Sequence, residues 1–468
     1  MPAAPSESNS SPARSLDFPT GTLLIIANMI GVGVFTTSGY LLNGVQSGWA
    51  VLAAWFLGGL SALCGALAYA ELGAALPENG GEYYFLTRIF HPAVGFSAAV
   101  ASLFVGFAAP LASFGLVFGA YLQRDFLPGV PPQVSGLALL AATAVIHTFR
   151  LGFGHRFQNW TTAGKLLLIL GFIAAGATFA IARIRTGIPL ENLGPITKAD
   201  WEALKSMPFA VGLIFVSFSY AGWNAVSYVA GEIQTPGRTI PRMLLAGTLT
   251  VTVLYCALNG AFLISVPRKT LTASEQNMER IAGLAGESLL GESGGRAVSF
   301  LIIAGLIATT GALTYTGARV TEALGHRYPA LRILAIRRVE GGPIFAIILQ
   351  LAIAAGLLLS SRVDDLMTYA GFTLILFNMA VVTGVIVLRI REPQLARPWR
   401  MWGYPVTPVL FLALQAWVVW NMIAGAANRS GSGHHVALFG FGTVVLGAIL
   451  YFIVRLGGEN RTDSTASE

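Results

Sequence analysis

Two glycines interrupt an apolar run near the start of the chain. Gly31 and Gly33 lie midway through residues 18–42, and hydroxyl residues follow them. At about 1.5 Å per residue this run could cross a bilayer as a helix, but glycine weakens a helix. Backbone groups that leave a helix at membrane depth must bind protein, ligand or enclosed water. One interpretation is therefore a broken helix that holds a polar molecule, and the other is close packing of a neighbouring helix.

A second interruption lies in the other half of the chain. Residues 215–224 place small and polar side chains in the middle of the apolar run 207–231, with Gly222 at the centre. Interrupted helices in corresponding positions of two halves are typical of secondary transporters with an inverted repeat. The halves show no residue-by-residue identity, so this repeat is inferred from the layout of the apolar runs.

The backbone at such breaks predicts a particular ligand. A half-helix that begins after Gly33 presents free N–H groups, which suit a carboxylate. Half-helices that end near Met29 and Phe218 present free carbonyls, which suit an ammonium group. A zwitterion of amino-acid size satisfies both. Neither interrupted run carries an Asp or Glu near its middle, and a backbone site needs none.

Three side chains next to the second break have two interpretations each. Phe218 and Tyr220 either cap a bound molecule or fill the core. An intramembrane Asn needs a hydrogen-bond partner, so Asn224 either braces loose backbone or contacts the ligand. We keep these alternatives open at this point.

Lys165 is the one Lys or Arg that lies inside an expected span and away from its ends. It could extend back to the membrane interface, because it lies about 10 Å along the helix from Gln158. It could instead donate to carbonyls freed by the first break and occupy the place of a coupling sodium ion. Glu71, at the end of the second run, is either a solvated helix end or a brace. The aromatic segment 77–86 is either a re-entrant piece or an amphipathic linker.

Composition indicates a membrane protein. Of 468 residues, 54% are hydrophobic and 11% are charged, against about 25% charged in soluble domains. The net charge of +7 comes from basic residues in short loops, which favours positive-inside topology over nucleic-acid binding. Cys64 and Cys256 both lie in apolar runs, so we expect no disulfide framework, metal site or cofactor.

The apolar runs predict an all-α polytopic protein of about 12 transmembrane helices. The expected spans are 18–43, 48–76, 93–121, 134–149, 160–182, 207–231, 243–266, 296–320, 342–360, 366–389, 405–426 and 435–455.

Topology and domain organisation follow from these spans. An even number of spans puts both termini on one side, and the distribution of Lys and Arg favours the cytoplasm. We expect a disordered cytoplasmic tail over 1–15, a ten-helix core over 16–390, two additional helices over 391–456 and a cytoplasmic tail over 457–468.

Several motifs together resemble one family of membrane proteins. They are Gly31-Val-Gly-Val-Phe35, Tyr69-Ala-Glu-Leu-Gly73, Gly80-Gly-Glu-Tyr83, Gln158 through Ala163-Gly-Lys-Leu-Leu167, and Ala221-Gly-Trp-Asn224 followed by Glu232 and Pro236. This set is similar to the amino acid-polyamine-organocation superfamily, and most similar to its L-type amino acid transporters and their bacterial relatives, over about residues 16–325.

The resemblance implies a five-plus-five inverted repeat with discontinuous helices 1 and 6 and a central substrate site. By position the resemblance implies that Val32 and Gly33 offer N–H groups to the substrate carboxylate. It also implies that the amine binds carbonyls, those of Met29, Phe218 and Ala221. Phe218 would be the aromatic gate, and Lys165 would replace the sodium ion. Gly31, Gly222 and Asn224 complete the expected substrate-binding set.

The chain also departs from the family pattern. Val32 stands where many members have Ser or Thr, and Thr314 replaces an Asn often seen in the eighth helix. L-type members of eukaryotes bond to a heavy chain through a cysteine in the loop after the third span. Residues 121–133 contain no cysteine, so we expect no such partner.

The expected function is secondary active transport of amino acids across the cytoplasmic membrane, independent of sodium, by exchange or proton coupling. The alternatives are a transporter of polyamines or other organic cations, or an amino acid sensor that does not transport. An enzyme is not expected, because His91, His147 and His155 show no catalytic or ligand spacing. The expected partners are the substrate and the lipid bilayer, and the oligomeric state is left open.

Overall fold

The described part of the chain is helical. The computed structural model describes residues 16–149, 155–337, 342–428 and 432–465. Within these ranges eight helices are long and apolar enough to cross a membrane, and four shorter apolar helices accompany them. The shorter ones are Phe18–Met29, Pro132–Thr148, Met207–Ser219 and Ile344–Ser360. The prediction of an all-α polytopic protein is confirmed at this level.

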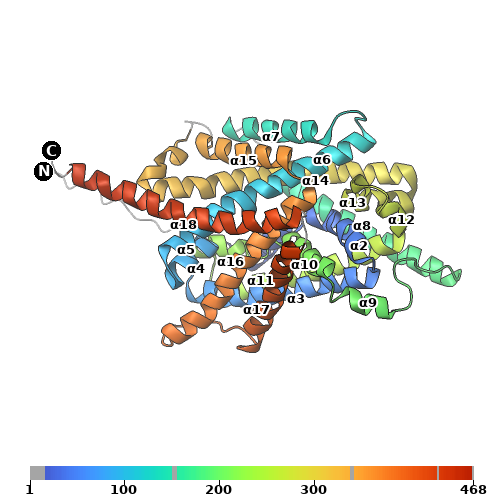
Figure 1. Ribbon diagram of the computed structural model, residues 1–468, viewed down its shortest axis with the longest axis horizontal. Coiled ribbons are helices and arrows are strands. Elements are labelled where there is room, and N and C mark those ends of the chain that lie inside the picture. Colours follow the sequence, from blue (N-terminus) through green and yellow to red (C-terminus); the bar gives the residue numbers. More distant parts are fainter. Residues whose placement is uncertain (1–15, 150–154, 338–341, 429–431, 466–468) are drawn as a thin grey trace.

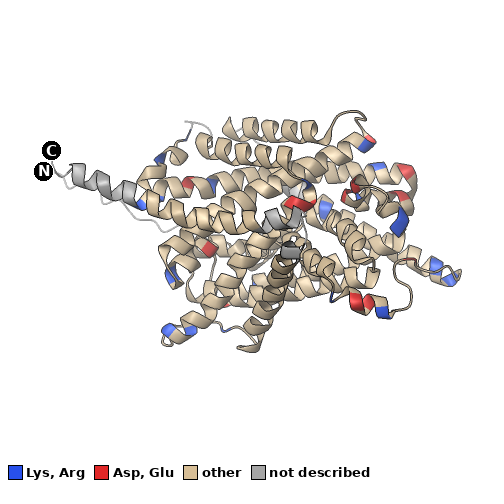
Figure 2. Cartoon of the chain, in the orientation of Figure 1, with Lys and Arg blue, Asp and Glu red and all other residues tan. Residues whose placement is uncertain are grey.

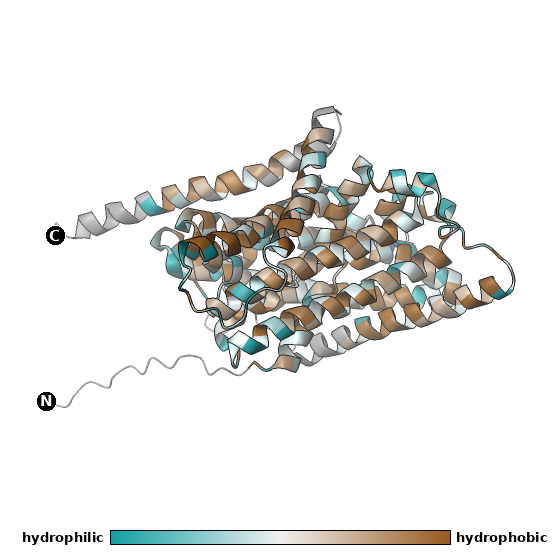
Figure 3. Cartoon of the chain, turned by 90° about the horizontal axis from the view of Figure 1, so that it is seen from below, coloured by the Kyte–Doolittle hydropathy of each residue, from teal (hydrophilic) through white to brown (hydrophobic). Residues whose placement is uncertain are grey.

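Charge divides the bundle into a central apolar zone and two polar ends. Figure 2 shows most Lys, Arg, Asp and Glu residues toward the two ends of the long helices, and Figure 3 shows mainly apolar residues along the helices between these ends. One end carries α4 (Gly81–Ile89) and the other carries α13 (Glu275–Glu279), as Figure 1 shows. We call these ends the α4 face and the α13 face.

The first and sixth expected spans are interrupted helices, as predicted. α1 covers Phe18–Met29, a 3-10 turn η1 covers Gly33–Phe35, and α2 covers Thr37–Val45. In the second half, α10 covers Met207–Ser219 and the 3-10 segment η3 covers Ala225–Glu232. Asp17 caps α1 by accepting from the Thr20 N–H, so this half-helix begins at a side-chain cap.

The remaining long helices coincide with the other expected spans. They are α3 (Gly48–Ala75), α5 (Pro92–Ala101) continued by the π-helical η2 (Ser102–Ala108) and α6 (Ala109–Asp125), α7 (Pro132–Thr148), α8 (His155–Arg185), α11 (Pro236–Ser265), α14 (Ile281–Arg327), α15 (Ile344–Ser360), α16 (Val363–Arg391), α17 (Val406–Asn428) and α18 (Ser432–Thr465).

The segments between spans contain more helix than the sequence predicted. α9 (Lys198–Ala203) lies in the expected loop 183–206, while α12 (Arg268–Leu271) and α13 lie in the expected loop 267–295. α14 begins at Ile281 rather than near 296, with a non-helical residue, Gly291, at φ 75°. The short loop after Arg327 also forms a 3-10 segment, η4 (Pro329–Ala335).

The core around the two breaks is aromatic and closely packed. The rings of Trp55 and Tyr255 meet edge to face at 5.4 Å, and Tyr220 lies 5.1 Å from Tyr255. α3 approaches α11 closely, because a methyl group at Gly59 would lie 2.3 Å from the side chain of Thr252. This packing fixes α3 and α11 behind the interrupted helices.

Candidate functional site

The two interrupted helices touch each other at their breaks. A methyl group added at Gly33 would lie 2.9 Å from the Cα atom of Ser219, so only glycine allows this approach. Gly222 adopts φ 100°, and a methyl group there would lie 2.9 Å from the Asn28 carbonyl oxygen. The hydroxyls of Thr37 and Ser219 lie 2.7 Å apart. The two breaks thus form one site, which is the arrangement that the broken-helix interpretation requires.

Carbonyls at the end of α1 are stabilised by side chains from other helices. The Met29 carbonyl accepts from the Tyr255 hydroxyl at 2.5 Å and from the Gly31 N–H at 2.8 Å. The Ile30 carbonyl accepts from the Lys165 ammonium at 3.2 Å. A helix end leaves its last carbonyls without partners inside the helix, and these side chains supply them. Because both lone pairs of the Met29 oxygen are engaged, this carbonyl can bind an ammonium group only if one donor yields.

N–H groups after the first break remain available. Val32 is the N-cap of η1 and Gly33 is its first residue. The first N–H groups of a helix have no acceptor within that helix, and no acceptor is recorded for these two among the described residues. Free N–H groups of this kind are suited to a carboxylate.

Lys165 reaches the first break. Its Nζ donates to the Ile30 carbonyl and to the Thr309 hydroxyl of α14. The alternative in which Lys165 extends back to the interface is therefore wrong. Thr309 also donates to the Gly305 carbonyl of its own helix at 2.8 Å, so it links the ammonium group to α14.

The residues at the second break divide between the cavity and the core. Phe218, Ala221, Gly222 and Asn224 all line the cavity. The Phe218 carbonyl accepts from the Ala221 N–H at 3.0 Å, whereas no donor to the Ala221 carbonyl is recorded among the described residues. Tyr220 also lines the cavity, but it is 1% exposed and its hydroxyl donates to the Trp55 carbonyl at 3.0 Å, so most of this side chain packs in the core.

Asn224 braces the site rather than its own backbone. Its amide nitrogen donates to Glu82 Oε1 at 2.8 Å, and Glu82 comes from α4. α4 buries Glu82, Phe85 and Leu86, so the segment 77–86 ends in a helix with one packed face, which is compatible with either interpretation of this segment.

The cavity at the breaks has a volume of about 420 Å³. Both breaks, α6 and the π-helical η2 contribute to its wall. π-helical turns frequently occur at functional sites, and here Ser102, Gly106 and Phe107 of η2 face the cavity. Two further lining residues, Asn28 and Thr316, are exposed, so the cavity opens toward the α4 face.

The α13 face is closed above this cavity. Thr36, Thr37 and Ser38 are 0% exposed, and Tyr40 donates to the Glu279 carboxylate at 3.0 Å. Glu279 lies on α13, outside the spanning helices. Burial raises the pKa of Glu279 to about 7, with a smaller contribution from nearby carboxylates and an opposing one from the Tyr40 hydrogen bond. A buried ion pair between Arg280 and Asp125 at 2.6 Å also joins α14 to α6 at this face.

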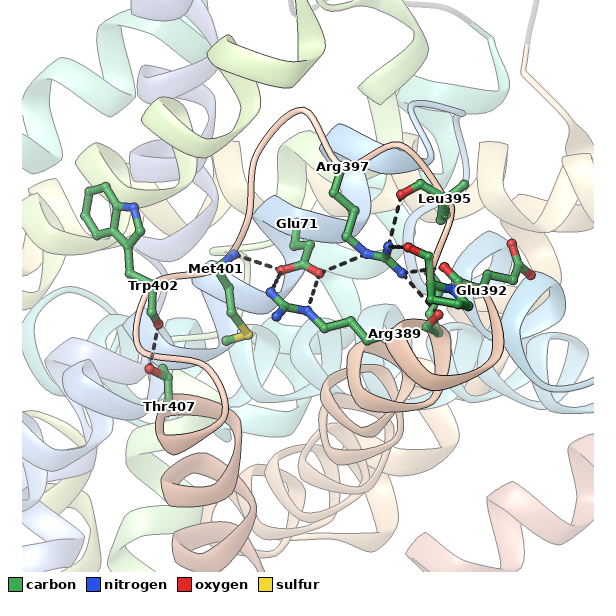
Figure 4. A network of polar contacts seen from close by, with 10 residues as sticks. Glu71, Arg389, Glu392, Leu395, Arg397, Met401, Trp402 and Thr407 are labelled. Carbon is green, nitrogen blue, oxygen red and sulfur yellow. Dashed lines mark hydrogen bonds and ion pairs between the residues drawn. The ribbon is translucent and has the colours of Figure 1, made fainter.

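A charge network joins three elements at the α4 face (Figure 4). Glu71 of α3 is 2% exposed and accepts from Arg389 of α16 at 2.6 and 2.9 Å. The Met401 N–H donates to the same carboxylate at 2.8 Å, and Arg397 Nε lies 3.4 Å from it. Glu71 is therefore a brace, and the solvated alternative is wrong. The network ties the segment between α16 and α17 across the end of α3.

Sequence reasoning missed three residues of the site. Tyr255 and Thr309 stabilise the first break from α11 and α14, and Glu82 reaches the cavity from α4. The motif Gly80-Gly-Glu-Tyr83 was noticed in the sequence, but only the packing of α4 against η3 shows that its carboxylate faces the site. Tyr255 lies in an uninterrupted apolar run that gives no signal of its own.

No metal or cofactor site is indicated by the described side chains. Among the residues that the structure describes, no three His, Cys, Asp or Glu side chains gather as metal ligands do.

Comparison with known proteins agrees with this geometry. The profile of the family described as Amino acid permease matches residues 16–447. The human "Large neutral amino acids transporter small subunit 2" is 30% identical over 414 residues, which cover 85% of this chain and 74% of that protein.

Two further relatives extend the range of similar proteins. The mouse "Asc-type amino acid transporter 1" is 29% identical over 93% of this chain and 81% of its own length. The "Serine/threonine exchanger SteT" of Bacillus subtilis (strain 168) is 27% identical over 83% of this chain and 86% of its own length. All three of these relatives are named as transporters or exchangers of amino acids. The family profile covers most of this chain, and two broken helices meet at one cavity. The chain therefore belongs to the amino acid permease family of membrane transporters.

Proposed function

We propose that this chain is a secondary active transporter that moves amino acids across the cytoplasmic membrane by alternating access. The contact between the two breaks carries this proposal, because the N–H groups of Val32 and Gly33 and the Ala221 carbonyl then lie at one cavity. Family membership supports amino acids as the substrate class. The cavity is open toward the α4 face and closed toward the α13 face, which is one of the two states that alternating access requires.

The substrate is held mainly by backbone groups in this proposal. Its carboxylate binds the N–H groups of Val32 and Gly33, next to Gly31. Its ammonium group binds the carbonyls of Ala221 and Phe218, and that of Met29 when the Tyr255 hydroxyl yields. Phe218, which is 7% exposed and lines the cavity, closes over the substrate as the aromatic gate. Gly222 and Asn224 shape the second half of the site.

Transport is independent of sodium in this proposal. The Lys165 ammonium group already supplies a positive charge to the Ile30 carbonyl at 3.2 Å, where a coupling sodium ion would otherwise neutralise the end of α1. Exchange and proton coupling both remain compatible with this arrangement.

We further propose that the α4 face is cytoplasmic. Arg319, Arg327, Arg332 and Arg391 lie near this end of the bundle, and basic residues mark cytoplasmic loops. The tails 1–15 and 457–468 are then cytoplasmic, the ten-helix repeat covers 16–390 and two additional helices cover 391–456. No cysteine lies in 121–133, so we expect no disulfide-linked heavy chain, although one relative is named a small subunit.

Reconstitution into liposomes tests the proposal. Radiolabelled L-leucine and L-threonine should enter vesicles that contain the protein and an unlabelled amino acid, and the uptake should persist when choline replaces sodium. A sensor would bind these amino acids without uptake. An organic-cation transporter would move putrescine and leave both amino acids outside. Either of these two results would overturn the proposal.

A further inference from the structure

A buried carboxylate faces the cavity from outside the two breaks. Glu82 is the second residue of α4 and is 4% exposed, yet it contributes to the cavity wall. α4 is not one of the spanning helices, and it packs against η3 and α16 (Figure 1). The proposed backbone site accounts for the binding of a zwitterion without this residue, so its carboxylate is available for another task.

The hydrogen bonds of Glu82 join the elements that surround the site. Its Oε1 atom accepts from the Tyr69 hydroxyl of α3 at 2.7 Å and from the Asn224 amide at 2.8 Å. The Tyr69 oxygen also lies 3.1 Å from Asn378 Oδ1 of α16. Asn224 stands directly after the second break, so a change at the Glu82 carboxylate reaches the proposed substrate site through one hydrogen bond.

No positive charge balances this carboxylate. Among the described residues, no Lys, Arg or His forms an ion pair with Glu82 within 4 Å. The titratable groups that face it are the phenols of Tyr69 and Tyr228. The charged residues at the far end of α4 bind elsewhere, because Arg88 pairs with Glu392 at 2.8 Å and Arg391 donates to the Ile89 carbonyl.

A carboxylate without a positive partner is costly in a dry environment. Such a group becomes neutral by binding a proton unless water or hydrogen bonds stabilise its charge. Burial raises the pKa of Glu82, and the hydrogen bonds from Tyr69 and Asn224 oppose this effect. In the present state the cavity is open to the α4 face, so water can reach the wall that Glu82 helps to form.

We propose that Glu82 binds a proton before the cavity closes at the α4 face, and that substrate and proton therefore cross the membrane in the same direction. A hydronium ion in the open cavity gives a proton to a carboxylate oxygen, which forms the O–H bond of the neutral acid and leaves a water molecule. Closure then removes water from a neutral group. When the cavity opens at the other face, the O–H bond breaks and water accepts the proton. This inference rests on the proposed function, since it requires alternating access.

The proposed function and this inference fail in different experiments. If the wild-type protein exchanges no amino acid, the proposed transport function is disproved. Wild-type protein that exchanges L-leucine, but whose net uptake of L-leucine into vesicles free of amino acid does not acidify them, retains the proposed function and disproves the inference. The pH inside the liposomes, reported by an enclosed fluorescent dye, distinguishes these outcomes.

The decisive variant is Glu82→Gln, which keeps the shape of the side chain and imitates the protonated form. Wild-type exchange of L-leucine should fall by up to about tenfold for each pH unit above the pKa of Glu82, because one proton is required. In E82Q the exchange rate should become independent of pH, and net uptake of L-leucine should no longer acidify the vesicle interior. Glu78→Gln, an exposed residue in the same segment, is the matched control and should behave as wild type.

A second variant separates protonation from packing. Glu82→Asp retains an acid and should still acidify the vesicles, with a displaced pH profile, even if E82Q does not fold. The inference is overturned if E82Q retains the wild-type pH profile and proton uptake. It is also overturned if E82D takes up L-leucine into vesicles free of amino acid without acidifying them.

Discussion

Replacing Lys165 by Met removes the ammonium group while keeping most of the apolar stem. The variant leaves the Ile30 carbonyl at the end of α1 without its donor at 3.2 Å. The Thr309 hydroxyl keeps its hydrogen bond to the Gly305 carbonyl, so the expected change in free energy comes from the hydrogen bond lost at the Ile30 carbonyl. A hydrogen bond from a charged donor contributes about 1.5–3 kcal/mol. If this bond holds the break in its binding conformation, affinity for L-leucine should fall by about 10-fold to 150-fold.

Thermal unfolding measured against ligand concentration gives this affinity. A ligand at 100 times its dissociation constant stabilises the folded protein by about 2.7 kcal/mol, which is measurable as a shift in Tm. Lys205→Met is the matched control, because Lys205 forms only an exposed pair with Glu202 and its side chain is 75% exposed. If K165M binds L-leucine within about twofold of wild type, Lys165 does not stabilise the break and the reasoning is refuted.

Three further perturbations test other parts of the account. Since burial raises the pKa of Glu279 from 4.5 to about 7, protonation should stabilise the closed α13 face by up to about 3 kcal/mol. A cysteine placed at Ser38 should therefore react more slowly with an impermeant thiol reagent as the pH falls below 7, and a rate that rises would contradict this. Gly33→Ala should lower the free energy of unfolding by about 1–3 kcal/mol and abolish exchange of amino acids, because the added methyl group overlaps the α10 backbone. Unchanged exchange in this variant would disprove the close approach of the two breaks. Glu71→Gln should lower the free energy of unfolding by about 3–5 kcal/mol, because buried guanidinium groups lose their partner. The more exposed Glu392→Gln should have a much smaller effect, and equal Tm values for the two variants would argue against the brace.

Much of the fold could be predicted, because a membrane-spanning helix requires an apolar run of a certain length and such runs are visible in the sequence. The apolar runs predict the long helices, and the glycines at 31, 33 and 222 predict where two of them stop. The helices α12, α13 and the start of α14 escaped prediction because they are short and polar or contain Gly291. Propensity in such segments is weak, and their helical form depends on packing across the α13 face.

The candidate site could be predicted in its backbone parts but not in its supporting side chains. The roles of Val32 and Gly33 follow from where a helix must begin again, and these roles stay predictions. The partners of the Met29 and Ile30 carbonyls depend on which face of α11 and α8 is turned toward α1. A sequence gives no such information for helices that are apolar on all sides, so Tyr255 was missed and Lys165 kept two interpretations.

Glu71 shows the same limit for charged residues. A carboxylate near the end of a span is usually solvated, and nothing local distinguishes this one. Its partners Arg389 and Arg397 lie more than 300 positions away in the chain, and only the fold brings them to α3.

The central claim is that backbone groups at the two breaks bind both ends of an amino acid. Competition during sodium-free exchange in liposomes tests this most directly. Unlabelled L-leucine should block uptake of labelled L-leucine, whereas its methyl ester, which lacks the carboxylate, and its N-acetyl derivative, which lacks the ammonium group, should not. If both modified forms compete as well as L-leucine itself, the breaks do not form the substrate site.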